Sequence, residues 1–240
     1  MTIGLPRPLI CLVTDRRRLD PPGAGSLLRL VGHAAMAGVD IIHVRESGLD
    51  DRQLAGLVRE VVAAVAGTPA RVVVNDRTDI ALATRAHGVH LRADSISAAR
   101  VRQLAPAGFL VGRSVHTRSE ALAAAHSGVD YLVAGTVYPT ASKAQGSPLL
   151  GLAGLGEVVR AVAVPVLAIG GVVADTVGDV AASGAAGVAA IGLFANVPTD
   201  ANDARYDRAL QELVARLRAP FERDPFDSAP PRSGQGPAGR

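Results

Sequence analysis

The sequence predicts an α/β fold, a (β/α)8 TIM barrel in one domain over residues 1–218. Short runs rich in Val, Ile and Leu recur eight times, and stretches with apolar residues three and four positions apart lie between them. Only 3% of the 240 residues are aromatic and Trp is absent, so aliphatic side chains must fill the interior. Aliphatic filling is typical of parallel barrels, and a chain of this length can bury one such core.

Each apolar run fits a parallel strand that is buried on both faces. In chain order, the predicted strands are residues 9–13, 40–44, 71–75, 88–91, 110–114, 131–134, 166–169 and 188–191. The helical stretches among them include residues 26–37, 50–66, 97–104, 118–126 and 155–163. Eight alternations of this kind predict that the sheet closes on itself.

Several connections carry a glycine just before the next strand, as at Gly38, Gly128 and Gly184. Glycine adopts the left-handed conformation that ends many helices, so these glycines are predicted to be structural. The last helix is predicted over residues 202–217. Residues 219–240 are rich in Pro, Gly, Ser and charge and lose the apolar periodicity, which predicts a disordered tail.

The composition argues against several classes of protein. The net charge is +3, but the basic residues are scattered and few aromatic residues lie among them, which argues against nucleic-acid binding. No membrane-spanning run and no secretory leader is expected, so the protein is predicted to be cytoplasmic. Cys11 lies in the first apolar run and is expected to pack in the core. The oligomeric state stays open, and a homo-oligomer is one of the outcomes.

Barrel active sites are built where strands end, so the polar residues just past each strand are informative. Here they are Thr14 and Asp15, Arg45 to Ser47, Asn75 to Arg77, Ser114 and His116, and Thr136 to Lys143. Four polar residues in the segments that follow strands are expected only to cap the next helix. They are Thr14, Asp50, Ser97 and Thr117.

His116 is the best candidate for acid/base chemistry. It follows the fifth strand directly, and a histidine side chain titrates near neutral pH. A capping or packing role is the alternative. Arg45 is favoured as a site residue because a cation at a strand end is costly unless it is paired or faces a ligand. His43 fits ligand binding and packing equally well, and His90, inside the fourth strand, is expected to pack.

The last two strands end in glycine, at Gly170, Gly171 and Gly192. Glycine lets backbone N–H groups approach an anion closely, and phosphate sites in barrels commonly lie at this place. No pair of His, Cys or carboxylate residues has zinc spacing. A metal would therefore be a weakly held Mg²⁺ that bridges Asp76 and phosphate oxygens.

At these strand ends the sequence resembles the family that holds thiamine phosphate synthase and thiazole tautomerase. The resemblance covers residues 9–195. The motifs that carry it are residues 40–46 (DIIHVRE), 74–81 (VNDRTDIA), 88–91 (GVHL), 112–116 (GRSVH), 130–131, 135–143 and 168–171 (AIGG). The resemblance implies the same barrel, a step in thiamine biosynthesis and a small phosphorylated thiazole as substrate.

The synthase branch joins a pyrimidine diphosphate to thiazole phosphate, and Mg²⁺, Arg and Lys neutralise the departing diphosphate. This sequence departs from the synthase pattern at His43, where a Gln is expected, and at Ser47, where a Lys is expected. Ser95 replaces the second magnesium carboxylate, unless Asp94 shifts by one position. The residues that do match the pattern are Arg45, Asn75, Asp76, Thr140 and Lys143.

The same departures resemble the tautomerase branch, whose substrate carries one phosphate and needs only a proton moved. The resemblance then implies that the phosphate lies on the N–H groups of Gly170, Gly171 and Gly192, and that His116 transfers the proton. Arg45 or Lys143 would hold the substrate carboxylate, while Asn75 would orient the ring.

The sequence therefore favours an isomerase, a thiazole tautomerase that uses no cofactor. Thiamine phosphate synthase, a transferase with Mg²⁺ at Asp76, is the alternative. A barrel that binds a phosphorylated ligand without catalysis is the third interpretation.

Overall fold

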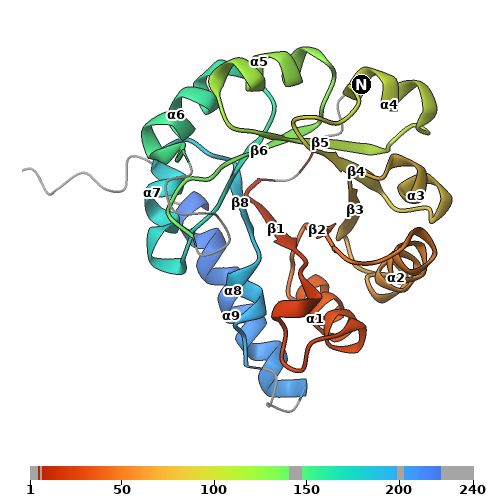
Figure 1. The fold of residues 1–240 in the computed structure, drawn as a ribbon. Coiled ribbons are helices and arrows are strands. Elements are labelled where there is room, and N and C mark those ends of the chain that lie inside the picture. Colours follow the sequence, from red (N-terminus) through yellow and green to blue (C-terminus); the bar gives the residue numbers. More distant parts are fainter. Residues whose placement is uncertain (1–4, 6, 141–147, 199–202, 223–240) are drawn as a thin grey trace, which may run out of the picture.

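Eight parallel strands close into a barrel in the computed structural model, which describes residues 5, 7–140, 148–198 and 203–222 (Figure 1). Each strand pairs with the next along the chain, and the eighth pairs with the first. The strands are β1 (Leu9–Val13), β2 (Ile41–Val44), β3 (Arg71–Asn75), β4 (Gly88–Leu91), β5 (Leu110–Val115), β6 (Tyr131–Gly135), β7 (Val166–Ile169) and β8 (Gly187–Ala190). The predicted fold is confirmed, and no strand end differs from its predicted position by more than one residue.

Helices surround the strands (Figure 1). They are α1 (Ala24–Met36), α2 (Asp51–Ala64), α3 (Thr78–Ala83), α4 (Ala98–Leu104), α5 (Arg118–His126), α6 (Gly151–Ala161), α7 (Val177–Ala182), α8 (Gly192–Ala195) and α9 (Asp203–Glu222). Two 3-10 turns, η1 (Arg16–Arg18) and η2 (Ala174–Thr176), follow β1 and β7. The short helices α3, α7 and α8 lack the length that makes apolar spacing visible in a sequence.

The last helix continues to Glu222 instead of ending at residue 217. Arg218 explains part of the difference, because its guanidinium donates to the carboxylate of Asp40 at 2.7 Å and also to two backbone carbonyl groups near the start of the barrel. These contacts hold the end of α9 against the strands, which local composition does not reveal. Residues 223–240, which were predicted to be disordered, lie outside the described residues.

Three of the four predicted helix caps are confirmed. The side chains of Asp50, Ser97 and Thr117 each accept a backbone N–H in the first turn of the helix that follows. Thr14 is different, and the prediction for it was wrong. Its hydroxyl accepts the N–H of Arg45 at 3.1 Å, so it joins the ends of β1 and β2 instead of capping a helix.

The strands are packed on both faces, and successive side chains alternate between them. In β1, Leu9, Cys11 and Val13 belong to a cluster inside the barrel, whereas Ile10 and Leu12 belong to the layer between strands and helices. The same alternation holds in the other strands. An inward residue near the end of each strand therefore forms the last layer below the open mouth of the barrel.

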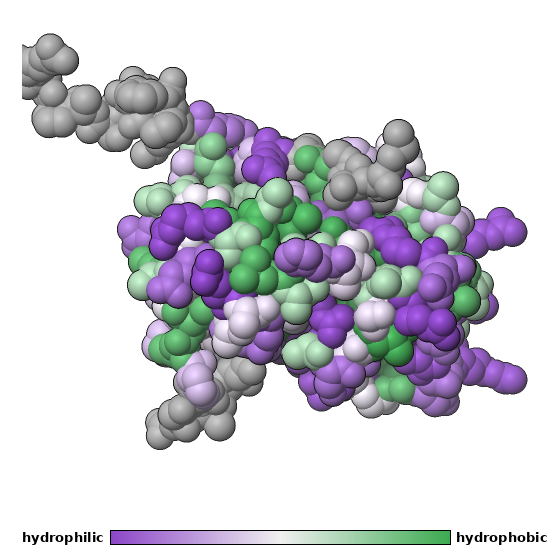
Figure 2. Space-filling view, turned by 90° about the horizontal axis from the view of Figure 1, so that it is seen from above, coloured by the Kyte–Doolittle hydropathy of each residue, from purple (hydrophilic) through white to green (hydrophobic). Residues whose placement is uncertain are grey.

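The face of the molecule seen from above in Figure 2 carries both hydrophilic and hydrophobic residues, and the hydrophobic ones gather in one area of it. The large hydrophobic side chains exposed among the described residues are Met36, Ile96, Leu104, Leu149 and Val173. None of the described helices is long and apolar enough to cross a membrane. The cytoplasmic location and a homo-oligomeric state stay predictions.

Candidate active site

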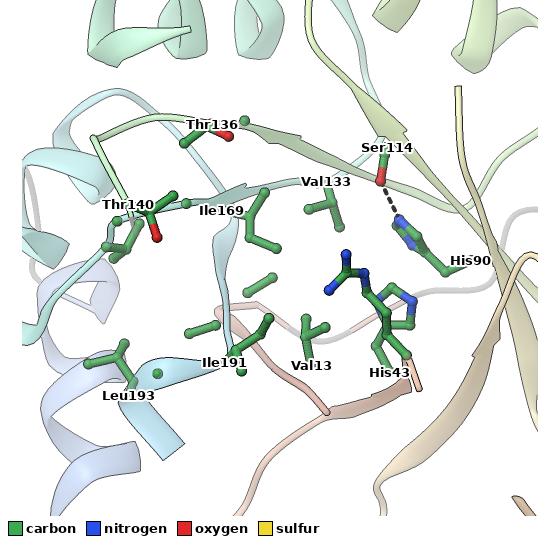
Figure 3. A pocket seen from close by; sticks show the side chains of 18 of the residues that line it. Val13, His43, His90, Ser114, Val133, Thr136, Thr140, Ile169, Ile191 and Leu193 are labelled. Atoms are coloured by element: carbon green, nitrogen blue, oxygen red, sulfur yellow. Dashed lines mark hydrogen bonds between the residues drawn. The ribbon is translucent and has the colours of Figure 1, made fainter. Parts of the chain in front are cut away.

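A cavity of about 590 Å³ opens at the carboxyl ends of the strands. Its floor is the last layer of inward side chains, which are Val13, His43, Asn75, His90, Ser114, Val133, Ile169, Ala189 and Ile191. Figure 3 shows His43, His90 and Ser114 together on one side and Thr136 and Thr140 on the other, with apolar side chains between them. The cavity can therefore hold a small ring on an apolar floor with polar groups around its edge.

The structure brings most of the predicted site residues together. The predicted residues that line the cavity are His43, Arg45, Asn75, His116, Thr140, Gly170, Gly171 and Gly192. Asp76 follows Asn75 but is not among the described lining residues, and Lys143 lies outside the part of the chain that the structure describes. Ser114 and Thr136, which the sequence analysis placed at the mouth without a role, line the cavity as well. Lining residues that it did not place there are Arg18, His90, Arg92 and Asn196.

His116 lies at the mouth, immediately after β5. Its Nδ1 atom is 2.5 Å from the carbonyl oxygen of Gly135, at the end of the neighbouring strand β6. A carbonyl oxygen only accepts, so Nδ1 must carry a hydrogen. In the neutral ring the lone pair then lies on Nε2, which makes this atom the base. The backbone N–H of His116 donates to Glu120 at 2.7 Å and fixes the residue at the start of α5.

Two further histidines form part of the cavity floor. The rings of His43 and His90 lie 4.4 Å apart between centroids. His43 Nε2 is 3.2 Å from Oδ1 of Asn75, while the nitrogens of His90 lie 2.9 Å from the hydroxyl of Ser114 and 3.2 Å from that of Tyr131. His90 packs as predicted, and it also lines the cavity.

The electrostatics of the floor keep both rings neutral. Burial lowers the pKa of His43 to about 4, an effect that the hydrogen bond to Asn75 opposes and the charge of Arg45 reinforces. Burial lowers the pKa of His90 well below its usual range, with smaller contributions from His43 and Arg113. At neutral pH the floor therefore offers hydrogen bonds but no charge.

The glycines at the end of β7 have a structural cause. Gly170 and Gly171 have φ angles of 96° and 65°, in the left-handed region that glycine adopts at little cost. A side chain on Gly170 would collide with Thr136, and one on Gly171 would collide with the backbone of Pro139. The loop after β6 packs directly on this turn, and the N–H of Tyr138 donates to the carbonyl of Gly170 at 2.9 Å.

The charged groups of the cavity wall are all cationic. Arg18, Arg45 and Arg92 line it, and no Asp or Glu is among the described lining residues. Arg92 is partly neutralised, because its guanidinium lies 2.6 Å from the carboxylate of Asp94. A wall with this charge balance favours an anionic ligand.

Comparison with known proteins assigns the family. A family model described as thiamine monophosphate synthase (TMP-TENI) matches residues 10–194. This chain belongs to the thiamine monophosphate synthase family. It is accordingly a thiamine-biosynthesis enzyme of that family, as the resemblance of the motifs implied.

Individual members of the family are similar over most of their length. The thiamine-phosphate synthase of Methanospirillum hungatei is 38% identical over 180 residues, which is 75% of this chain and 86% of the relative. That of Chlorobium luteolum is 34% identical over 212 residues, 88% of this chain and 95% of the relative. A solved thiamine phosphate pyrophosphorylase from Pyrococcus furiosus is 30% identical with a TM-score of 0.73, covering 90% of this chain and 98% of that one. The names of these relatives support the synthase alternative better than the tautomerase.

Asp76, the carboxylate expected to hold Mg²⁺ in a synthase, interacts with two side chains in this structure. One oxygen of the Asp76 carboxylate accepts the hydroxyl of Ser95, and the other lies 3.8 Å from the guanidinium of Arg92. Asp94 points its carboxylate to Arg92. The described residues hold no group of three or more His, Cys, Asp or Glu suited to a metal ion. If Mg²⁺ bound here, Asp76 would be its protein ligand, and water and substrate phosphate would supply the other oxygens.

Proposed function

We propose that this member of the thiamine monophosphate synthase family is a thiazole tautomerase. In this isomerisation a 2-carboxy-thiazole phosphate loses a proton from one carbon and gains a proton at another, which leaves an aromatic ring. The observation that carries the proposal is the hydrogen bond from His116 Nδ1 to the carbonyl of Gly135, which leaves Nε2 as a base at the mouth of the cavity. A positioned histidine of this kind can both remove and return the proton.

The charge of the cavity supports a substrate with two anionic groups. Gly170, Gly171 and Gly192, at the ends of β7 and β8, would receive the phosphate through their N–H groups. Arg45, directly after β2, would pair with the substrate carboxylate, and Asn75 at the end of β3 would orient the ring. Lys143, the other candidate for the carboxylate, stays a prediction.

Thiamine phosphate synthase is the second candidate function. The names of the relatives favour it, and this chain retains Arg45, Asn75 and Thr140 at the cavity wall. The arrangement around Asp76 speaks against it, because Ser95 and Arg92 already interact with the carboxylate that would bind Mg²⁺. Asp76 would be the metal ligand if this function held.

An assay of the purified protein with both sets of substrates separates the two functions. We expect the 2-carboxy-thiazole phosphate tautomer to be converted to the aromatic product, as followed by NMR. We expect no thiamine phosphate from pyrimidine diphosphate, thiazole phosphate and Mg²⁺. Formation of thiamine phosphate with multiple turnovers would reverse the ranking. Tight binding of thiamine phosphate with neither reaction would support the non-catalytic barrel.

Removal of metal gives a separate prediction. Because no step in the proposed isomerisation uses Mg²⁺, treatment with EDTA is expected to leave the rate of aromatisation unchanged. The same measurement with added Mg²⁺ should give the same rate. A rate that falls with EDTA and recovers with Mg²⁺ would contradict the metal-free mechanism.

A further inference from the structure

Arg18 lies where a cation was not predicted. It ends the turn η1, in the loop between β1 and α1, and it lines the cavity beside the start of α8. Its Nη2 atom is 3.5 Å from the place that a Cβ atom on Gly192 would occupy. The side-chain nitrogen of Asn196 is 3.9 Å from the same place. The first loop of the barrel therefore places a guanidinium over the glycine that follows the last strand.

The other two arginines of the turn are engaged in the fold. Arg16 forms an ion pair with Glu46 at 2.9 Å, and Arg17 forms one with Asp15 at 3.2 Å. The backbone N–H of Arg18 donates to Asp15, but its guanidinium forms no hydrogen bond or ion pair with any described residue. Since the described cavity wall also contains no carboxylate, the charge of Arg18 faces the cavity without a counter-ion from it.

Glu46 fixes the position of the turn. Its side chain is 0% exposed, and its carboxylate accepts both the backbone N–H and the guanidinium of Arg16. A buried carboxylate bound by two donors of one residue holds that residue rigidly. Glu46 lies two residues after the end of β2, so its contacts with Arg16 hold the first loop against the end of that strand. Arg16 precedes Arg18 by two residues in the same turn.

We propose that Arg18 binds the phosphate group of the ligand above Gly192, and that Glu46 is a positioning residue that acts through Arg16 to hold Arg18 there. The identity of the ligand rests on the proposed function, since the phosphate would be that of the thiazole. A guanidinium presents parallel N–H groups that match two phosphate oxygens, and the glycine below leaves room for the third. Arg18 would thus distinguish phosphorylated thiazoles from their free alcohols.

Binding measurements with a matched control test Arg18. We expect Arg18→Ala to weaken the affinity for thiazole phosphate about 10- to 100-fold, the usual effect of losing a charge-assisted hydrogen bond, and to leave the affinity for the unphosphorylated thiazole alcohol unchanged. Arg17→Ala removes the same charge from the same turn and should change neither affinity. Arg18→Lys should lose part of the affinity, because an ammonium lacks the paired donors.

A double-mutant cycle tests Glu46. We expect Glu46→Gln to weaken thiazole phosphate binding in the wild-type background and to have no further effect in the Arg18→Ala background. Thermal unfolding of each variant reports any general loss of stability. An equal loss of affinity in both backgrounds would show that Glu46 does not act through Arg18.

Thermal unfolding in the presence of inorganic phosphate tests the Arg18 phosphate site independently of the proposed reaction. Protection of the wild type against thermal unfolding by phosphate, absent in Arg18→Ala, would support the site even if the protein failed to aromatise the thiazole. Equal protection of wild type and Arg18→Ala would overturn the Arg18 site, whatever the reaction. Protection of neither protein, together with no binding of thiazole phosphate, would overturn both the site and the proposed function.

Discussion

The His116→Ala variant is expected to aromatise the thiazole about 10²- to 10⁴-fold more slowly than the wild type, the usual range for a lost general acid/base. Its affinity for thiazole phosphate should stay close to the wild-type value, because the proposed phosphate site lies at the ends of β7 and β8 and His116 follows β5. The change should therefore fall on kcat rather than on KM.

His126→Ala is the matched control for this variant. His126 ends α5, the helix that His116 precedes, and its Nδ1 atom also lies close to a backbone carbonyl, that of Leu122 at 2.7 Å. It is not among the lining residues of the cavity. The control should retain full activity. If His116→Ala retained it as well, His116 would have no part in proton transfer.

The stability of the protein is expected to fall as the pH falls from about 6.5 to about 4. Burial lowers the pKa of His43 to about 4, whereas an unfolded histidine titrates near 6.5. Between these values the unfolded chain binds a proton that the folded chain does not, so acid favours unfolding. His43 alone should reduce the free energy of unfolding by about 3 kcal/mol between pH 7 and pH 4. The effect of His90 has the same sign.

Urea unfolding at a series of pH values measures this effect. His43→Gln is the informative variant, because glutamine keeps an N–H donor for Asn75 and does not titrate. We expect its stability to fall less steeply over the same pH range, with His90 accounting for the remaining slope. Equal slopes in wild type and variant would show that His43 is not held neutral by burial.

Repetition made the barrel predictable from the sequence. Each of the eight strands is packed on both faces and therefore appears in the sequence as an apolar run. Gly38, Gly128 and Gly184 lie in turns before strands, with φ angles of 97°, 87° and 85°. The end of α9 was missed because Arg218 and Asp40, far apart in the chain, stabilise it by a tertiary contact. Thr14 was misassigned for a similar reason, because its partner Arg45 directly follows the next strand.

Site residues could be predicted where the position of a strand end alone determines that they lie at the mouth of the barrel. Asn75 and His116 had to reach the mouth because Asn75 ends β3 and His116 directly follows β5. Arg18 was missed because it lies five positions beyond the end of β1, where only the path of the η1 turn brings it back to the cavity. The sequence did show three consecutive arginines there, but not which of them has a side chain without a partner among the described residues.

A structure of the protein with bound thiazole phosphate tests the central claim most directly. We expect the phosphate between Arg18 and the backbone of Gly170, Gly171 and Gly192, and the thiazole ring within about 3.5 Å of Nε2 of His116, the distance of a reactive contact. A phosphate bound at another place, or a ring beyond the reach of His116, would contradict the account.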